Sequence, residues 1–288
     1  MDPLQRRDLA VMWHPATHLD DLAALPPVPI RAASGAWLET NDGRRILDAI
    51  ASWWTSVHGH RHPAIVAAIH AQLETLDHVM FAGFTHEPAV RLAEALLAIA
   101  PSFARVFYAD SGADAIEIAL KLSRQHHAQS GAPERTRFAA LAHGYHGETL
   151  GALALCGSEV YRGPFAPLLH DAVFLPTPAL ARHAHGDLGS DAGADDAACA
   201  DAIALLDAHA HELAALVVEP LVQCAGQFRM MGTGYYRRVV AHARALGVHV
   251  VADEIAVGLG RTGRVLAGDW CDADVDLLCL GKGLGGGA

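Results

Sequence analysis

The sequence predicts an α/β fold in which a mostly parallel sheet is flanked by helices. Three observations support this prediction. From about residue 88 onward, helical and extended patterns alternate along the chain. The extended segments are unbroken apolar runs, which are typical of parallel strands buried on both faces. With 288 residues, 52% of them hydrophobic, the chain can bury a sizeable core.

Residues 1–60 are expected to form an N-terminal arm and part of a smaller α+β domain. Short strands are predicted at 30–33 and 36–39. Asn41-Asp42-Gly43 then supplies the turn of a tight hairpin, which returns through 45–47.

Residues 61–288 are expected to form the large domain. Its first helix opens at His62-Pro63, because proline fits the first turn of a helix, and its apolar stripe is Ile65, Ile69, Leu73 and Leu76. The segment 179–200 is rich in Ala, Asp, Gly and His and is expected to be a surface connection. The other predicted elements, in chain order, are helix 88–99, strand 105–109, helix 114–129, strand 138–141, strand 173–175, helix 197–211, strand 216–219, helix 235–246, strand 248–252 and strand 277–280.

Composition excludes several classes of protein. The formal net charge of −11, without any lysine or arginine run, argues against a nucleic-acid partner. No apolar stretch approaches 18 residues and the N-terminus has no continuous apolar segment, so neither a membrane span nor a signal peptide is expected. The five cysteines show no CxxC spacing and are expected to be free thiols in a reducing compartment. We therefore expect a soluble, cytoplasmic protein.

The 19 histidines raise the question of a metal site. They cluster at His126-His127, His183/His185 and His209/His211, but no HExxH or Cys/His zinc pattern is present. Solvated side chains are therefore expected at these clusters, and no metal.

Two strand ends carry residues that suit pyridoxal phosphate. Asp253-Glu254 follow strand 248–252, and Lys282 follows strand 277–280 on a glycine-flanked turn. A lysine amine can form a Schiff base with this cofactor, and an aspartate can keep the pyridine nitrogen protonated. An Asp-Glu pair could instead hold Mg²⁺, but no GxxxxGK[ST] loop precedes it.

Three further strand ends add polar groups to the same sheet edge. Ser111-Gly112 open the helix after strand 105–109, where free N–H groups can bind a phosphate, although a simple helix N-cap is an equal alternative. Tyr145 lies between glycines and can stack on a flat ring, although it could also be an ordinary loop tyrosine. Glu219 adds a carboxylate. Together these residues predict one ligand site along the carboxyl ends of the strands.

These motifs resemble the class III, fold type I aminotransferases that use pyridoxal phosphate. The resemblance runs from about residue 10 to the end of the chain. The stretches that carry it are Trp13-His14-Pro15-Ala16-Thr17, Ser52-Trp53-Trp54, 78–86, Asp110-Ser111-Gly112, Gly144-Tyr145-His146-Gly147, Val218-Glu219-Pro220, Ala252-Asp253-Glu254-Ile255, Gly260-Arg261-Thr262-Gly263 and Cys279-Leu280-Gly281-Lys282. The first three narrow it to a branch that acts in biotin biosynthesis. The implied reaction moves the amino group of S-adenosyl-L-methionine, through pyridoxal phosphate, to 8-amino-7-oxononanoate and gives 7,8-diaminononanoate.

The resemblance also implies roles for individual residues. Lys282 would be the Schiff-base lysine and proton shuttle, and Asp253 the partner of the pyridine nitrogen. With Tyr145 stacked on the ring, these three form the implied catalytic set. The implied cofactor-binding residues are Ser111, Gly112, Ala113, Tyr145, Glu219, Asp253 and Lys282. The implied substrate-binding residues are Trp53, as an apolar wall for the long methylene chain, Tyr145, Glu148 and Lys282.

The chain departs from the family pattern in three ways. Many members of this branch have tyrosine where Ala16 stands, and aspartate is common at the position of Glu148, so lysine or another ω-amine is a rival amino donor. Family members also continue well past residue 288, so a C-terminal truncation is expected, and a non-catalytic fragment is an alternative. A homodimer is expected by resemblance.

Overall fold

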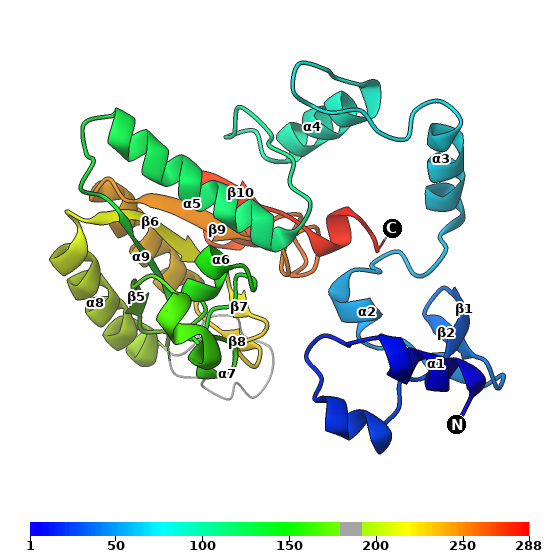
Figure 1. The fold of residues 1–288 in the computed structure, drawn as a ribbon. Helices are drawn as coiled ribbons and strands as arrows, with labels where there is room; N and C mark the ends of the chain where they lie inside the picture. Colours follow the sequence, from blue (N-terminus) through cyan, green and yellow to red (C-terminus); the bar gives the residue numbers. More distant parts are fainter. Residues whose placement is uncertain (179–191, 288) are drawn as a thin grey trace. The chain divides into compact units, whose positions relative to one another are not determined.

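The computed structural model describes residues 1–178 and 192–287 (Figure 1). The chain forms two compact units. The first contains Met1–Phe84 and the last few residues from Gly285 onward, and the second is Thr85–Leu284. Residues 61–84, which the sequence analysis assigned to the large domain, therefore cluster with the first unit. The domain division at residue 60 stays a prediction.

The first unit combines helices with a three-stranded antiparallel sheet, order β1-β2-β3. Its strands match the predicted ones closely, and Trp37 pairs with Ser34 across one turn and with Leu47 in the next strand. The elements of this unit are α1 (Pro3–Val11), η1 (Leu19–Ala23), β1 (Ile30–Ser34), β2 (Trp37–Thr40), β3 (Arg45–Leu47), α2 (Ala51–Trp54) and α3 (Pro63–Leu73).

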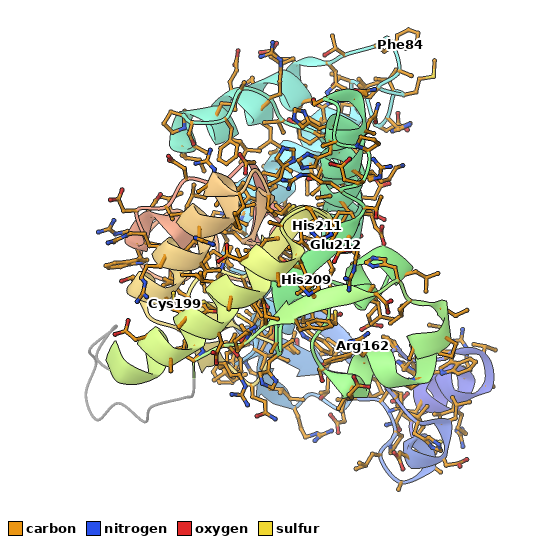
Figure 2. The ribbon with its side chains drawn as sticks, turned by 90° about the vertical axis from the view of Figure 1, so that its left-hand side faces the viewer. Phe84, Arg162, Cys199, His209, His211 and Glu212 are labelled. Atoms are coloured by element: carbon orange, nitrogen blue, oxygen red, sulfur yellow. The ribbon has the colours of Figure 1, made fainter. Side chains whose placement is uncertain are left out.

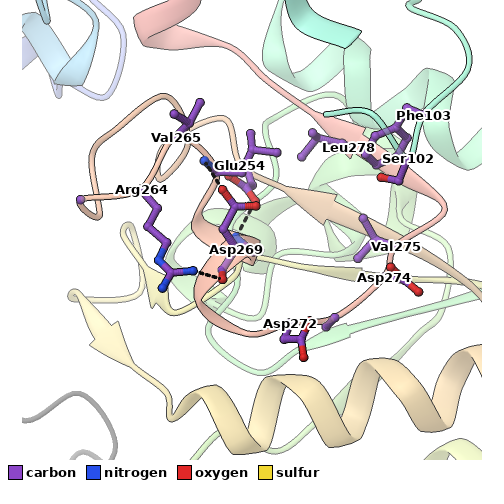
Figure 3. Close-up of a pocket in the computed structure, with 14 residues that line it drawn as sticks. Ser102, Phe103, Glu254, Arg264, Val265, Asp269, Asp272, Asp274, Val275 and Leu278 are labelled. Carbon is purple, nitrogen blue, oxygen red and sulfur yellow. Dashed lines mark hydrogen bonds between the residues drawn. The ribbon is translucent and has the colours of Figure 1, made fainter. Parts of the chain in front are cut away.

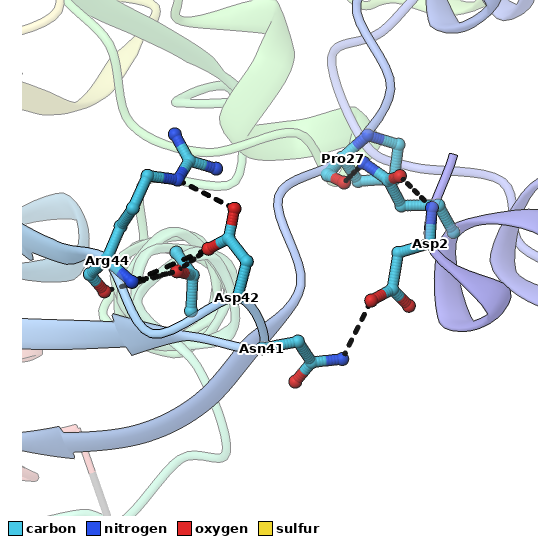
Figure 4. Close-up of polar contacts among 7 residues, drawn as sticks. Asp2, Pro27, Asn41, Asp42 and Arg44 are labelled. Atoms are coloured by element: carbon cyan, nitrogen blue, oxygen red, sulfur yellow. Dashed lines mark hydrogen bonds and ion pairs between the residues drawn. The ribbon is translucent and has the colours of Figure 1, made fainter.

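Side-chain hydrogen bonds fix the predicted Asn41-Asp42-Gly43 turn (Figure 4). The Arg44 N–H donates to Thr40 Oγ1 at 3.0 Å, and Arg44 Nε donates to Asp42 Oδ2 at 2.9 Å. Asn41 Nδ2 lies 3.5 Å from Oδ2 of Asp2, the residue that caps α1. This region was predicted only as an N-terminal arm, but Asp2 and Gln5 form a capping box, a recognisable helix-start signal.

Helix α2 is a left-handed turn made of ordinary residues. Ala51, Ser52, Trp53 and Trp54 have φ values of 48°, 45°, 62° and 71°. This conformation brings Cβ close to the carbonyl oxygen and costs about 1–2 kcal/mol per residue. Asp48 supports the turn, because its Oδ2 accepts from Ser52 Oγ at 2.7 Å. The side chain of Trp53 is 63% exposed.

Helix α3 begins at Pro63 as predicted, but its apolar stripe is not buried. Ile69 is 42% exposed and Leu73 is 61% exposed. The apolar face of α3 therefore has little cover among the described residues.

The second unit contains the predicted parallel sheet. All four strand pairings in the order β10-β9-β6-β4-β5 are parallel. The elements of this unit are α4 (Glu87–Ile99), α5 (Gly112–Gln129), β4 (Arg137–Leu141), α6 (Leu150–Ala154), α7 (Glu159–Arg162), η2 (Gly163–Leu168), β5 (Ala172–Leu175), α8 (Ala192–His209), β6 (Leu213–Val218), β7 (Val222–Gln223), β8 (Arg229–Met230), α9 (Thr233–Ala245), β9 (His249–Asp253), η3 (Ala267–Trp270), β10 (Leu277–Cys279) and η4 (Lys282–Leu284).

Helices cover both faces of this sheet (Figure 1). One core cluster joins α5 and α6 to alternate strand residues such as Ala140, Val217 and Val251. Since successive strand residues point to opposite faces, their neighbours face the other layer, where α8 contacts β5 and α9 contacts β9. All six residues of β6 are buried. The prediction of strands buried on both faces is confirmed.

The predicted strand 105–109 is wrong. The structure has no strand there, and Phe107 is 70% exposed. A strand needs a neighbouring strand to satisfy its backbone groups. Residues 105–109 pair with no strand of the described sheet, in which β10 is an edge strand that pairs only with β9. Tyr108 instead donates its hydroxyl to the Ala89 carbonyl at 2.5 Å.

The histidine clusters differ from one another. His209 lies beside Glu212 at the end of α8, with Nδ1 2.6 Å from Oε1, and His211 is exposed (Figure 2). His127 is buried, so the expectation of solvation is wrong there, because Nε2 donates to the carbonyl of Ala214 at 2.9 Å. His183 and His185 lie outside the described residues.

Four other findings concern the described part of the chain. It contains no group of His, Cys, Asp and Glu that could hold a metal ion. None of its helices could cross a membrane. All five cysteines are free and buried. Of the segment 179–200, residues 179–191 lie outside the described part, and α8 already begins at Ala192.

Candidate active site

The candidate site lies at the carboxyl ends of β4, β6 and β9. The chain leaves β4 toward β5 on one side and leaves β6 toward β9 on the other. Ligands of open α/β sheets bind where the strand order reverses in this way, outside the carboxyl ends of the strands. The loops after β4 and β6 meet at this point.

Glu219 joins these two loops. It follows β6 directly and is 4% exposed. Its Oε2 accepts from the Tyr145 N–H at 3.0 Å, and its Oε1 accepts from the Cys224 N–H at 3.3 Å. Burial raises the pKa of Glu219 to about 7, against the opposing effect of the nearby His146.

Asp253, at the end of β9, is held from two sides. His146 Nδ1 lies 2.7 Å from Oδ2, and the Ile255 N–H donates to Oδ1 at 3.1 Å. Both members of the His146–Asp253 pair are buried. Burial disfavours the imidazolium, but the hydrogen bond and charge of Asp253, with the charge of Glu219, outweigh it and raise the pKa of His146 above its ordinary value.

Lys282 follows β10 and opens η4, with a φ of 44°. The Glu254 N–H donates to the Cys279 carbonyl at 2.9 Å, which fixes the end of β10 next to the end of β9. Burial lowers the pKa of Lys282, although Asp253 and other nearby groups favour the ammonium form. A partly buried amine with a lowered pKa beside carboxylates is a recognised sign of a functional site.

Two glycines allow close contact between the loops of the site. A Cβ on Gly112 would lie 2.9 Å from Cδ1 of Ile255. A Cβ on Gly147 would lie 2.6 Å from Cβ of Ala113, and Gly147 also has a φ of 128°. The loop at the start of α5 therefore packs against both the loop after β4 and the residue after Asp253-Glu254.

Ser111 caps α5 at the same place. Its Oγ accepts from the Asp114 N–H at 3.1 Å, and the side chain is exposed. This confirms that Ser111 is a helix N-cap, the alternative raised from the sequence. The same geometry leaves the first N–H groups of an 18-residue helix available to an anion.

Tyr145 is oriented by Glu148. The Tyr145 hydroxyl donates to Glu148 Oε1 at 3.0 Å, and the ring meets that of Tyr161 edge-on, with centroids 5.0 Å apart. Burial, together with the hydrogen bond and charge of Glu148, raises the pKa of Tyr145 above its ordinary value. The hydroxyl therefore keeps its proton at neutral pH and donates it in the hydrogen bond to Glu148.

The structure separates the two members of the Asp-Glu pair. Glu254 turns to η3, where its Oε2 accepts from the Ala267 N–H at 2.6 Å and its Oε1 from the Gly268 N–H at 2.8 Å. Burial raises its pKa to about 7. Glu254 also borders a separate hollow of about 670 Å³, whose lining includes Phe103, Arg264 and Asp269 (Figure 3). The two carboxylates thus serve different partners, which argues against the Mg²⁺ alternative.

The site brings together most of the residues singled out from the sequence. Contacts or charge interactions connect Ala113, Tyr145, Glu219, Asp253 and Lys282 with their neighbours in the second unit. Trp53 is not among these residues, because it belongs to the first unit.

Sequence reasoning missed the contributions of His146, Cys224 and Ile255. His146 stands inside a motif quoted above, but its contact with Asp253 spans 107 positions, and no local pattern signals it. Ile255 and Cys224 act through proximity to Gly112 and Glu219, which likewise depends on the tertiary fold.

The donor set fits pyridoxal phosphate. The cofactor needs a carboxylate for its pyridine nitrogen, an amine for its carbonyl carbon and N–H groups for its phosphate. Asp253, Lys282 and the start of α5 supply groups of these three kinds. Gly112 and Gly147 keep the space between the loops free of side chains.

The chain is similar to known proteins over nearly its whole length. Residues 21–288 match the family model described as aminotransferase class-III. The adenosylmethionine-8-amino-7-oxononanoate aminotransferase of Nitratidesulfovibrio vulgaris is 42% identical, over 99% of this chain and 53% of its own length. The protein of the same name from Synechococcus elongatus is 41% identical, over 96% of this chain and 63% of its own length.

Two solved structures are also similar to this chain over nearly its whole length. The crystal structure of adenosylmethionine-8-amino-7-oxononanoate aminotransferase from Methanocaldococcus jannaschii has a TM-score of 0.89 and 31% identity, over 99% of this chain and 63% of that one. A PLP-bound amine transaminase from an uncultivated Pseudomonas species has a TM-score of 0.85 and 33% identity, over 95% of this chain and 62% of that one. The chain therefore spans between half and two thirds of the length of these relatives.

Proposed function

Because the chain belongs to the class-III aminotransferase family, we propose that it catalyses a transamination with pyridoxal phosphate. The amino group of S-adenosyl-L-methionine would be transferred to 8-amino-7-oxononanoate, giving 7,8-diaminononanoate for biotin biosynthesis. Relatives at 31–42% identity carry the corresponding name. The observation that carries the proposal is that Glu219, Asp253 and Lys282, which follow or end the neighbouring strands β6, β9 and β10, lie close enough to interact electrostatically.

The bound cofactor would supply a carbonyl carbon that accepts an amino group and a ring that accepts electrons from the substrate carbon. Lys282 would hold that carbonyl carbon through its Nζ atom. The buried carboxylate of Asp253 would face the pyridine nitrogen, and a negative charge there favours the protonated ring. Ser111, with the N–H groups of Gly112 and Ala113, would bind the phosphate.

Lys282 is also suited to moving a proton. Burial lowers its pKa, so that the neutral amine is more accessible near neutral pH. A neutral Nζ can take a proton from the substrate carbon and return it at the next step. The carboxylates nearby stabilise the ammonium that forms each time.

Tyr145 and Glu148 would border the substrate. The Tyr145 ring would lie against the cofactor ring, held by the hydrogen bond to Glu148. Glu148 would keep a second carboxylate oxygen available to an amino group of the substrate. Trp53 would supply an apolar wall for the methylene chain, each methylene contributing about 0.8 kcal/mol when buried.

We also propose a cytoplasmic homodimer. Five free, buried cysteines suit a reducing compartment, and the resemblance implies a site built from two subunits. Sedimentation of the PLP-loaded protein should give a dimer. A monomer that retains PLP and full activity would contradict the dimer.

The sequence makes a direct test of the lysine possible, because it contains only two lysines, Lys121 and Lys282. The protein would be incubated with PLP, reduced with borohydride and mapped by peptide mass spectrometry. The adduct should appear at Lys282 and disappear in Lys282→Ala. The matched control Lys121→Ala, at an exposed position of α5, should retain it.

The amino donor is tested on the same preparation. S-adenosyl-L-methionine should convert the visible absorbance band of bound PLP to the band of the amine form, and L-lysine should leave it unchanged. Absence of an adduct at Lys282 would refute the proposed chemistry. Conversion by L-lysine alone would refute only the donor.

A further inference from the structure

His146 is tied to the candidate site through both its backbone and its side chain. Its ring is buried, and Nδ1 lies 2.7 Å from Oδ2 of Asp253. Its N–H donates to Cys156 Sγ at 3.4 Å. A carboxylate has no hydrogen to donate, so Nδ1 carries the proton in this contact. Nδ1 therefore directs its N–H at Asp253 whether the ring is neutral or protonated.

The other ring nitrogen, Nε2, is buried and makes no competing hydrogen bond within the described part of the chain. The position that a Cβ on Gly144 would occupy lies 3.0 Å from Nε2, so the ring is closely confined on this side. The contact with Asp253 is consequently the hydrogen bond that the ring of His146 makes within the described part of the chain.

The charges around the pair explain what the contact does. Glu219 lies close enough to interact electrostatically with both His146 and Asp253. A like charge favours protonation of a carboxylate, whereas a hydrogen bond donated to the carboxylate favours its ionised form. Lys282 also interacts with Asp253 but carries the reacting amine. The Ile255 N–H donates to Oδ1 of Asp253, and His146 is the side chain that donates to Oδ2 without carrying the reacting amine.

We propose that His146 is a positioning residue that holds the Asp253 carboxylate in the orientation that faces the ligand, and thereby sets how strongly the site binds a protonated pyridine ring. This inference rests on the proposed function, because it assumes that Asp253 faces the pyridine nitrogen. It adds a residue whose effect on the ligand passes entirely through Asp253.

Cofactor binding, measured without turnover, tests the inference. Dissociation constants would be measured by spectral titration for PLP and for 1-deaza-PLP, in which a carbon replaces the pyridine nitrogen. The wild-type protein should prefer PLP. His146→Leu, which removes the donor, should reduce this preference by roughly tenfold or more, as expected for loss of a charge-assisted hydrogen bond, and should leave binding of the deaza analogue nearly unchanged.

Two further variants separate positioning from folding. His146→Asn places an amide N–H near the position of Nδ1 and should restore much of the preference for PLP. His242→Asn removes a comparable histidine from the His242–Asp207 pair, whose Nε2–Oδ1 distance is also 2.7 Å, and should leave both dissociation constants unchanged.

Several outcomes would overturn the inference. Equal weakening of PLP and its deaza analogue in His146→Leu would show that the residue has only a structural role. A ¹⁵N NMR spectrum of the wild-type protein that shows Nδ1 without a proton would overturn it even if every variant misfolds. If wild-type protein binds no PLP and gives no adduct at Lys282, the proposed function fails. If it binds PLP normally but His146→Leu keeps the full preference, only the present inference fails.

Discussion

Replacing Glu254 by glutamine should change the pH dependence of the stability of the second unit. Glu254 is 2% exposed and accepts two backbone N–H groups from the start of η3. Burial raises its pKa from the ordinary 4.5 to about 7. The folded protein therefore holds a proton between these two pH values that the unfolded chain releases. The stabilising contribution is complete below pH 4.5 and is lost as the pH rises through 7.

The size of the effect follows from the two pKa values. Each unit of difference corresponds to about 1.4 kcal/mol, so Glu254 should reduce the free energy of unfolding by about 3 kcal/mol across this window. Glu219, whose pKa is also raised to about 7, should contribute a similar slope. Glutamine does not titrate, so Glu254→Gln should remove roughly half of the combined slope.

Urea denaturation at pH 5, 6, 7 and 8 would measure this slope. Trp270 reports on the right region, because it ends η3 and its Nε1 donates to the Thr262 carbonyl at 3.1 Å. The other tryptophans all lie in the first unit and would be replaced by phenylalanine. Glu94→Gln, at an exposed position of α4, is the control and should keep the wild-type slope. An unchanged slope in Glu254→Gln would refute the assignment of this proton to Glu254.

Three more predictions follow from local geometry. Gly147→Ala should lower the free energy of unfolding by about 1–3 kcal/mol, because its Cβ would lie 2.6 Å from that of Ala113; Gly263→Ala, with a positive φ but no such contact, should cost less in the same urea assay. Ala51→Gly should raise the melting temperature of the first unit, because Ala51 has a φ of 48° and glycine adopts this conformation without strain; a lower melting temperature would argue against a left-handed α2. Burial and nearby histidine charges lower the pKa of His249. The stabilising contribution of the neutral imidazole is therefore present above pH 6.5 and is lost as the pH falls. Between pH 7 and pH 5, thermal denaturation should show a smaller loss of stability for His249→Phe than for the wild-type protein.

The sheet could be predicted because its strands are buried on both faces. Runs such as 138–141 and 216–219 contain no polar alternation, and the structure places β4 and β6 there within a few residues. The segment 105–109 has the same character but forms no strand. An apolar run indicates burial and not pairing, and pairing requires a neighbour that the local sequence does not specify. The five-residue α6 was missed because it is shorter than two helical turns and offers no periodicity.

The site was predictable to the extent that its residues follow strand ends. Glu219 and Asp253 each come directly after or at the end of a strand, and parallel strands bring their carboxyl ends to one edge. What the sequence could not show was the partner of each carboxylate. Tyr145 N–H is 74 positions from Glu219, and the imidazole of His146 is 107 positions from Asp253.

Burial of the site residues also shifts the pKa values of their ionisable groups. Burial raises the pKa of Glu219 and lowers that of Lys282, so each group is pushed toward its neutral form. His146 acts on Asp253 through geometry, because its Nδ1 lies 2.7 Å from Oδ2 and fixes the carboxylate. The site therefore combines an oriented carboxylate with a partly buried amine whose pKa is lowered. Removal of His146 should therefore disturb the ligand through Asp253, whereas removal of Glu219 should disturb the proton balance of the whole site.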